Sequence, residues 1–233
     1  YHPIVLAPAT VQEAIDLTML AFDLAEKYRM LVFVVADGAI GQMMEPAEMP
    51  PMRELEQVRP DWALTGAKGR EPNLVTSIHL GADEMEAYNE HLQRKLARVA
   101  ASGEVRFEAI ALEDADWAIV AFGTAGRIAQ TAVTQLREQG IKAGLFRPIT
   151  LWPFPERELH ELAQQVQGML VVEMNAGQMV HDVRAAVAAQ VPVHFHGRMG
   201  GAMPVPGDIS QEIIQFSRSG KDAQVEGSNG HIS

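Results

Sequence analysis

The sequence predicts an α/β protein in which most of the chain builds one mostly parallel, five-stranded sheet with helices on both faces. The first observation is a regular alternation of short apolar segments with longer amphipathic ones over residues 105–217. Strands that alternate with helices of about 10–15 residues are typical of βαβ units. The second is the composition, 47% hydrophobic but only 6% aromatic, which indicates a core built from aliphatic side chains.

Residues 1–40 indicate part of another α/β domain. Residues 11–29 carry helical spacing, and Thr10 with Glu13 three residues later forms a capping-box pattern. Residues 31–36 are fully apolar, which is typical of a strand buried on both faces of a parallel sheet. One such strand cannot form a sheet alone. We therefore expect a carboxyl-terminal domain remnant with an exposed apolar surface that promotes association. The apolar positions of the helix are Val11, Ile15, Leu17 or Thr18, Phe22 and Ala25.

Residues 41–80 are expected to form an extended connector between the two domains. Pro46, Pro50, Pro51 and Pro60 disfavour any regular element in this segment. Its Met and Leu residues and Trp62 make the segment more apolar than a solvated tether. This composition favours a connector packed against a neighbour over a flexible linker.

Residues 81–219 are expected to form the second domain, and the polar tail, residues 220–233, is expected to be disordered. An amphipathic helix over 83–101 opens this domain. The short apolar strand candidates are 105–111, 117–122, 142–146, 169–173 and 191–196. The longer helix candidates are 126–139, 156–166, 179–190 and 208–217.

Charge and cysteine content exclude several functions. A net charge of −11 argues against nucleic acid and anionic membranes, which both require clustered Lys and Arg. The chain has no cysteine, so it cannot form a disulfide, hold zinc through thiolates or ligate an iron–sulfur cluster. No apolar run approaches the roughly 18–20 residues that span a bilayer. We expect a soluble, cytoplasmic protein.

Polar residues at the carboxyl ends of predicted strands are the main site candidates, because ligands bind at that edge of open α/β sheets. Arg147 precedes a stiff segment, Trp152-Pro153-Phe154-Pro155, which fits either a loop that caps the sheet or a subunit interface. Glu173, Asn175 and Gln178 follow the strand at 169–173 and can bond either a ligand or a neighbouring backbone and helix terminus.

Three further signals are weaker. Arg198 precedes Gly200-Gly201 and could clamp a carboxylate or phosphate, or lie in a loop against another chain. The turn at 123–126 (Gly-Thr-Ala-Gly) could present backbone N–H groups to an anion, but a tight turn without a ligand is favoured. His194 and His196 share one strand face and could bind metal, yet His181 is the only further ligand nearby, so satisfied strand-end histidines are favoured.

Six ordered motifs resemble the α subunits of 2-oxoacid:ferredoxin oxidoreductases, most closely the branched-chain (2-oxoisovalerate) type. The resemblance extends from Tyr1 to about Arg218. The motifs are VLAP with QE (5–8, 12–13), GQMMEP (41–46), FGT (122–124), LFRPITLWPFP (145–155), VEMNAGQM (172–179) and GRMGG (197–201).

The resemblance implies an enzyme that decarboxylates a 2-oxoacid oxidatively, forms acyl-CoA and passes electrons to ferredoxin. It implies thiamine diphosphate with Mg²⁺ and iron–sulfur clusters, a β subunit and in some complexes γ and δ subunits, and an oligomer. It also implies the fold: the end of a thiamine-diphosphate-binding (pyrimidine) domain, followed by a domain similar to the carboxyl-terminal domain of transketolase.

The first part of the pyrimidine domain, with its cofactor-activating glutamate, has no counterpart in this sequence. The resemblance therefore assigns no catalytic, cofactor-binding or metal-binding residue here. Its matched polar positions are interface or near-site residues, namely Arg147, Glu173, Asn175, Gln178 and Arg198. We expect the chain alone to be inactive and to hold no cofactor.

Two alternatives stay open. The chain could be a non-catalytic assembly or docking module, or a carboxyl-terminal domain of a transketolase or deoxyxylulose-phosphate synthase, although those lack the GQMMEP and WPFP motifs. The sequence does not determine the 2-oxoacid, because branched-chain, 2-oxoglutarate and pyruvate enzymes share this domain.

Overall fold

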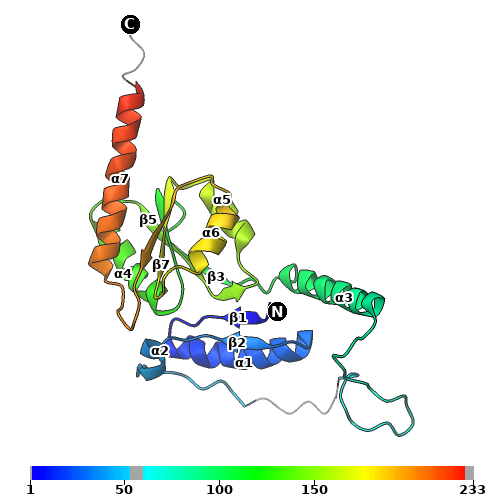
Figure 1. Cartoon of the computed structure of the whole chain (residues 1–233). Coiled ribbons are helices and arrows are strands. Elements are labelled where there is room, and N and C mark those ends of the chain that lie inside the picture. Colours follow the sequence, from blue (N-terminus) through cyan, green and yellow to red (C-terminus); the bar gives the residue numbers. More distant parts are fainter. Residues whose placement is uncertain (1, 53–59, 229–233) are drawn as a thin grey trace. The chain divides into compact units, whose positions relative to one another are not determined.

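The computed structural model describes residues 2–52 and 60–228 and divides the chain into two compact units (Figure 1). The first unit comprises residues 1–47 and 99–233 and contains both sheets, whereas the second comprises residues 48–98. Within the described ranges, no helix is long and apolar enough to cross a membrane.

A small three-stranded sheet contains the predicted strand of the first segment. β1 (Ile4–Leu6) pairs in parallel with β2 (Val32–Val34) and antiparallel with β6 (Thr150–Trp152), and α1 (Val11–Tyr28) connects β1 to β2. A short α2 (Gly38–Gln42) follows. The strand predicted at 31–36 therefore does have partners, and one of them comes from the region where we expected only a stiff loop. The sequence pattern could not predict β6, because a segment of three residues that lies beside two prolines is too short to show the alternation of apolar and polar residues typical of a strand.

The exposed apolar surface expected of this segment lies on the strand at 31–36. Leu31 is 71% exposed, and Phe33 and Val35 are also exposed, whereas Val32 and Val34 pack against a small core with α1. Successive strand residues point to opposite faces, and only the face towards α1 is covered within the described residues.

The large sheet confirms the predicted α/β fold. Its strands are β3 (Phe107–Ile110), β4 (Trp117–Ala121), β5 (Ala143–Pro148), β7 (Gly168–Glu173) and β8 (Val193–Gly197). Their order is β3-β5-β4-β7-β8, and every neighbouring pair is parallel except β3 with β5. The five strands correspond to the five predicted ones, and β3 is an antiparallel edge strand.

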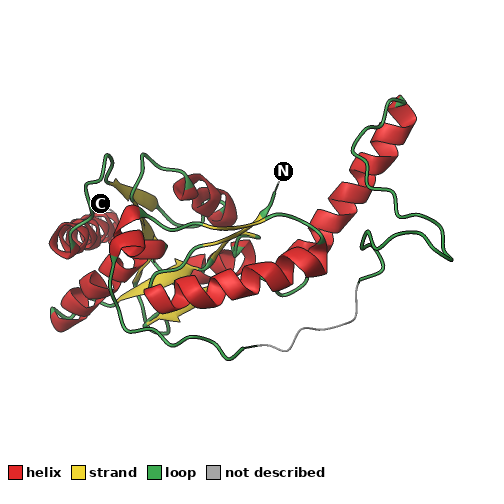
Figure 2. Ribbon diagram, turned by 90° about the horizontal axis from the view of Figure 1, so that it is seen from below, coloured by secondary structure: helices red, strands yellow, loops and turns green. Residues whose placement is uncertain are grey.

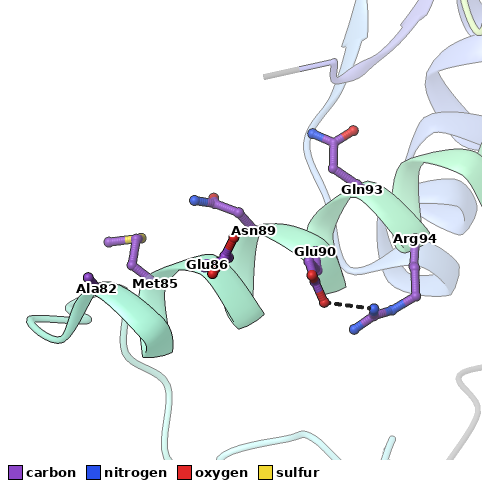
Figure 3. A pocket seen from close by; sticks show the side chains of 7 residues that line it. All are labelled: Ala82, Met85, Glu86, Asn89, Glu90, Gln93 and Arg94. Atoms are coloured by element: carbon purple, nitrogen blue, oxygen red, sulfur yellow. Dashed lines mark hydrogen bonds and ion pairs between the residues drawn. The ribbon is translucent and has the colours of Figure 1, made fainter.

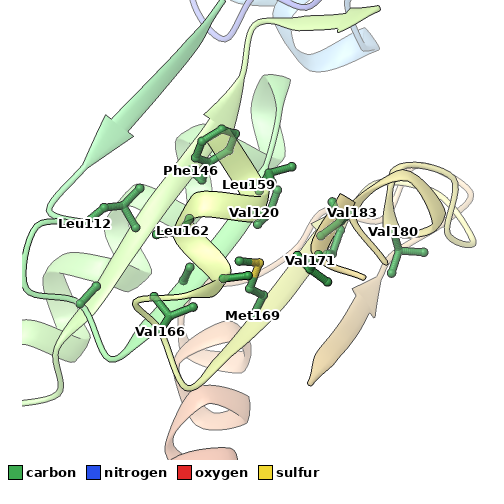
Figure 4. Close-up of a cluster of buried hydrophobic side chains, with 14 of the residues drawn as sticks. Leu112, Val120, Phe146, Leu159, Leu162, Val166, Met169, Val171, Val180 and Val183 are labelled. Carbon is green, nitrogen blue, oxygen red and sulfur yellow. The ribbon is translucent and has the colours of Figure 1, made fainter. Parts of the chain in front are cut away.

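Helices cover both faces of the large sheet (Figures 1 and 2). On one face, α5 (Glu156–Ala163) and α6 (Met179–Val187) bury apolar side chains against the strands, as Figure 4 shows for Leu159, Val180 and Val183. On the other face lie α4 (Gly123–Glu138) and α7 (Pro206–Ser228). This core is built mainly from aliphatic side chains, as the composition predicts.

Helix α7 continues to Ser228, eleven residues past its expected end at residue 217, and the disorder expected of the tail stays a prediction. The segment contains no proline, and its Lys, Ala, Gln and Glu residues favour a helix. Residues 229–233 lie outside the described residues.

The second unit contains most of α3 (Ala82–Ala100), which corresponds to the helix predicted at 83–101. Residues 43–52 and 60–81 carry turns but no helix or strand, as expected of an extended connector; residues 53–59 lie outside the described residues. None of the described residues between 48 and 98 is buried, and Leu80 is 92% exposed. The packing of this connector against a neighbour stays a prediction.

Candidate functional site

A small pocket lies at the point where the strand order of the large sheet reverses. The chain leaves β4 for its neighbour β5 and then returns to β7 on the other side of β4. Ligands in open α/β sheets bind outside the carboxyl ends of two such strands. Here the pocket has a volume of about 210 Å³. Its lining follows β2, β4 and β7: Val35, Ala36, Asp37, Phe122, Gly123, Ala125, Glu173, Met174 and Asn175.

Glu173, at the end of β7, caps helix α6. Its buried carboxylate accepts hydrogen bonds from the backbone N–H groups of Met179 and Val180, both at 2.9 Å, and of Gln178. The side-chain amide of Asn175 donates a further bond at 3.0 Å. A carboxylate at a helix N-terminus satisfies unpaired N–H groups and interacts favourably with the helix dipole.

Three other predicted residues surround this cap. The Oδ1 atom of Asn175 accepts the N–H of Gly177 at 2.7 Å, which fixes the turn after β7. Gln178 contributes its backbone N–H, and its side chain is exposed. The backbone N–H of Arg198 donates to the carbonyl of Glu173 at 3.1 Å, and its guanidinium lies 3.8 Å from Asp208. The structure thus brings Glu173, Asn175, Gln178 and Arg198 together.

Arg147 belongs to a separate cluster, on β5. Its buried guanidinium donates two bonds to Glu13 of α1, at 3.0 and 2.6 Å, and one to Glu108 of β3, at 2.7 Å. Burial lowers the pKa of Arg147, but the hydrogen bonds that it donates to its two carboxylate partners outweigh burial and raise it. Arg147 therefore joins α1 to the large sheet, as a bidentate Arg–carboxylate pair can.

The position of Glu13 follows from the capping box. Thr10 accepts the N–H of Glu13 at 3.1 Å, and the Glu13 carboxylate accepts the N–H of Ala9 at 2.7 Å. On the other side, Gly126 gives Arg147 room, because an added Cβ would lie 2.9 Å from the Arg147 side chain. Residues 123–126, expected to form a tight turn before the helix, are the first turn of α4, and the Gly126 N–H bonds the Phe122 carbonyl at 3.0 Å.

Two further ion pairs join the same parts of the first unit, and sequence reasoning missed both. Glu45, in the GQMMEP motif, accepts the first N–H of α1 from Val11 and pairs with Arg127 of α4 at 2.5 Å. The bond from Val11, followed by that from Arg127, lowers the pKa of Glu45. The only sequence signal for Glu45 was the GQMMEP motif itself. Its partners Val11 and Arg127 lie so far away along the chain that residue spacing cannot predict the contacts.

The second missed cluster is centred on buried Glu104. It accepts bonds from Lys27 at 2.8 Å, from the Tyr28 hydroxyl at 3.0 Å and from Arg106 at 3.3 Å. Burial alone would raise the pKa of Glu104, but the hydrogen bonds from Lys27 and Tyr28 lower it.

The pocket at the β4–β7 edge does not fit an anionic cofactor. Among the residues that the structure describes, no Lys, Arg or His lines it, and its two carboxylates are already engaged: Glu173 caps α6, and Asp37 accepts the N–H groups of Ala39 and Ile40. A diphosphate requires cations or free N–H groups. The chain has no cysteine for an iron–sulfur cluster.

The two strand histidines face α7 and have partners there. Nδ1 of His196 lies 2.7 Å from Glu212, and His194 stacks on Phe216 with ring centroids 3.6 Å apart. Burial lowers the pKa of His194. Over residues 2–52 and 60–228, no group of three potential ligands is placed to hold a metal ion.

Two larger hollows lie elsewhere. One, of about 760 Å³, lies beside Phe107, Trp152 and Phe154, where the Trp152–Pro153 peptide is cis. The other extends along one face of α3 (Figure 3) and is lined by residues of that helix alone, so it has no second wall.

Two family models match parts of this chain. Residues 1–110 match the family described as the thiamine-diphosphate-binding domain of pyruvate flavodoxin/ferredoxin oxidoreductases. Residues 115–209 match core domain II of pyruvate:ferredoxin oxidoreductase. Two models of this oxidoreductase class therefore match adjoining parts of the chain.

Individual relatives show which type of oxidoreductase subunit the chain resembles. The chain is 45% identical over 224 residues to the ketoisovalerate oxidoreductase subunit VorB of Methanothermobacter marburgensis, covering 95% of this chain and 62% of that protein. It is 31% identical to the 2-oxoglutarate synthase subunit KorA of Methanothermobacter thermautotrophicus, covering 94% of this chain and 65% of that protein. The resemblance to α subunits of the branched-chain type is confirmed, and the chain spans less than two thirds of the length of these relatives.

A solved structure agrees with the fold. The 2-oxoglutarate:ferredoxin oxidoreductase of Magnetococcus marinus, determined with 2-oxoglutarate, coenzyme A and succinyl-CoA bound, matches with a TM-score of 0.72. The match covers 91% of this chain and 42% of that one at 22% identity. It shows a shared fold.

Proposed function

We propose that the chain is a portion of the α subunit of a branched-chain 2-oxoacid:ferredoxin oxidoreductase. The complete enzyme would convert a 2-oxoacid and coenzyme A to acyl-CoA and CO2, with two electrons passed to ferredoxin. The observation that carries this proposal is the 45% identity to VorB over 95% of the chain, together with the two matched domain families. The lower identity to the KorA subunits, 31% at most among those compared, favours a branched-chain substrate over 2-oxoglutarate.

Within this proposal, the chain serves as a structural part of the subunit, and the cofactors are held elsewhere in the complex. Thiamine diphosphate with Mg²⁺ and the iron–sulfur clusters would be held by the remaining part of the subunit and by a β subunit, with γ and δ subunits in some complexes. The lack of cysteine and the poor fit of the β4–β7 pocket to a diphosphate support this allocation. We place the complex in the cytoplasm, where ferredoxin would receive its electrons.

One observation favours the alternative of an assembly or docking module. The polar residues matched to family motifs are engaged in contacts within the chain: Arg147 with two carboxylates, and Glu173 with the terminus of α6. Such contacts position the parts of a scaffold and leave few groups for chemistry.

An assay of the reconstituted complex tests the proposal. The full-length subunit that contains this sequence would be combined with its β subunit and supplied with coenzyme A, a viologen acceptor and each of three 2-oxoacids. We expect the highest kcat/KM with 2-oxoisovalerate, followed by 2-oxoglutarate and pyruvate. Absence of acyl-CoA with every 2-oxoacid would overturn the proposal.

A binding titration separates the two functions. We expect the present chain alone to bind thiamine diphosphate weakly, because no described residue is arranged to hold it. Micromolar affinity in calorimetry would contradict the allocation of the cofactor to the rest of the complex. Full activity of a complex from which this chain has been omitted would support the docking module instead.

A further inference from the structure

Strand β3 forms an accessible edge of the large sheet. Within the described residues it lies at one end of the strand order, beside β5, and Phe107, Glu108 and Ala109 are exposed. At the other end, every residue of β8 is half-buried, and the two β8 histidines contact α7. Edge strands of natural proteins are often protected from further pairing by lysine or proline. β3 carries neither, and its one charged residue, Glu108, is bound to Arg147.

The backbone groups of Phe107 and Ala109 point away from the sheet. The carbonyl oxygen of Arg106 accepts the N–H of Ile149 at 2.9 Å, so the backbone of Arg106 is turned towards the sheet. Residues of an antiparallel strand bond inward and outward in alternation, so the N–H and C=O groups of Phe107 and Ala109 are turned outward. The register agrees, because Phe107 lies opposite Pro148, which has no N–H to donate. Outside the strand ladder, no hydrogen bond of the described residues reaches Phe107 or Ala109.

Two hollows lie next to this edge, on the side of the sheet that α5 covers. Phe107 stacks on Phe146 with ring centroids 4.8 Å apart, and Phe146 packs with α5 (Figure 4), so Phe107 and Ala109 face that side. The smaller hollow, of about 200 Å³, has an apolar wall of Phe107, Ala109, Leu112, Phe146 and Leu162. It shares Phe107 and Glu158 with the larger hollow of about 760 Å³, and together the two form the β3–α5 groove. Alternate side chains of an added strand would enter this groove.

The rim of the groove is acidic, because α5 contributes Glu156, Glu158 and Glu161 to it. Arg157 is the one basic residue among the described residues that line it, and its side chain is 80% exposed and bound to Glu158 at 2.7 Å. Glu161 is attracted by the charge of Arg157 but forms no ion pair with it in the described structure. The groove is therefore complementary to a ligand in which basic residues flank an apolar centre.

We propose that β3 and the β3–α5 groove bind an extended segment of another protein as an additional strand. On the side that faces α5, this segment carries apolar residues flanked by Lys or Arg, which reach Glu156 and Glu161. Its backbone bonds the outward groups of Phe107 and Ala109, which is the strand-addition mode of peptide recognition. A second copy of the chain does not fit, because its other edge strands, β2, β6 and β8, carry no Lys or Arg. The proposal does not depend on the proposed enzymatic function.

A fluorescently labelled heptapeptide, Lys-Thr-Val-Thr-Val-Thr-Lys, tests the proposal with the whole chain. Its Val and Lys side chains lie on one face of a strand and its Thr side chains on the other. The peptide reads the same in both directions, so it can add in parallel or antiparallel. We expect saturable binding in fluorescence anisotropy, weakened about tenfold or more when Glu replaces Lys in the peptide. N-methylation of its Thr and Val residues removes the backbone donors without altering the charge and should abolish binding.

Two variants of the chain locate the bound peptide. Ala109→Pro removes one outward N–H and leaves the ladder to β5 intact, as proline can on an edge strand. Glu161→Lys reverses one charge on the rim. We expect each variant to bind the peptide about tenfold or more weakly than wild type. Should Ala109→Pro fail to fold, Glu161→Lys and the N-methylated peptide still decide the outcome.

Two control variants exclude other binding modes. Glu138→Lys introduces the same change of charge on exposed α4, across the sheet, and should keep wild-type affinity if binding is not a response to net charge. Phe33→Lys alters the exposed edge of β2 and should also keep wild-type affinity. Absence of saturable binding to wild type up to about 1 mM peptide would overturn the proposal. So would a loss in either control equal to the loss in Glu161→Lys.

Discussion

At the residue scale, Arg147 shows how one side chain connects distant parts of the chain. Its partner Glu13 lies 134 positions earlier in the sequence, and both stay fixed through bonds to neighbouring groups. A guanidinium offers several donors in a fixed geometry, so it can bind Glu13 with two nitrogens and Glu108 with the third. Lysine could not replace it in all three bonds.

Removal of Arg147 should destabilise the protein strongly. Arg147→Ala leaves two carboxylates close together without their cation, and we expect a loss of about 2–4 kcal/mol in the free energy of unfolding. The matched control is Arg157→Ala, which removes an 80% exposed side chain paired with Glu158 and should cost less than about 1 kcal/mol. Urea denaturation of both variants checks this prediction, and equal losses would contradict it.

Acid should weaken the contact between β8 and α7. Burial lowers the pKa of His194; the charge of Glu212 opposes this effect, and that of Arg184 adds to it. The unfolded chain therefore binds more protons than the native state as the pH falls through the ordinary histidine range, near 6.5, and stability declines.

His194→Phe should reduce this pH dependence, because the new ring can stack on Phe216 but cannot titrate. The measurement is the urea midpoint at pH 7.5 and at pH 5.5 for both proteins. We expect a smaller drop in the variant than in wild type. An unchanged drop would show that other groups account for the acid sensitivity.

At the element scale, α4 illustrates a close approach that depends on glycine. An added Cβ at Gly126 would lie 2.9 Å from Arg147 Cδ and 3.0 Å from the carbonyl oxygen of Ala121, which is tighter than ordinary contact. The start of α4 can therefore approach β5 only because this position has no side chain.

Gly126→Ala should accordingly destabilise the protein by about 1–3 kcal/mol, despite the better helix propensity of alanine. Gly38→Ala in α2 is the matched control, since nothing lies within 4 Å of its added Cβ. We expect the control to be neutral or slightly stabilising. Thermal unfolding of both variants measures the difference, and a neutral Gly126→Ala would contradict the close packing.

Helix α1 shows what sequence spacing cannot decide. Of the apolar positions expected for this helix, Leu17 is buried but Phe22 is 72% exposed, and the buried Leu24 was not among them. Leu17 fits helical spacing with either Phe22 or Leu24, so either side could face the core. The pairing of β1 with β2 and β6 selected the Leu17–Leu24 side.

At the scale of the whole molecule, the open side of β2 is an aggregation hazard. Leu31, Phe33 and Val35 are exposed, and β2 is an edge strand of the small sheet within the described residues. Apolar edge strands pair readily with other chains. We expect the present chain to form assemblies larger than a dimer as its concentration rises.

Phe33→Lys should reduce these assemblies, since a charged edge opposes strand pairing. Met203→Lys, which also replaces an exposed apolar side chain by lysine, is the control and should leave them unchanged. Static light scattering over a concentration series measures the difference. Wild-type scattering that never exceeds that of a dimer would contradict the prediction.

The sequence by itself predicted the large sheet and the resemblance to the oxidoreductase relatives. Strands β4 and β7 of that sheet carry continuous apolar runs and are each followed by a helix with its own apolar period, so local patterns suffice to predict both. The capping box of Thr10 and the cap that Glu173 forms on α6 were also local signals, since their bonds join residues at most seven positions apart.

Only the tertiary structure decided what brings distant segments together. It paired β6 with β1, selected the buried stripe of α1 and gave Arg147 its partners Glu13 and Glu108. It also showed that Glu45 joins α1 to Arg127 of α4. These contacts depend on the three-dimensional proximity of residues that no periodicity links, because an ion pair or a three-residue strand leaves no repeating pattern in the sequence.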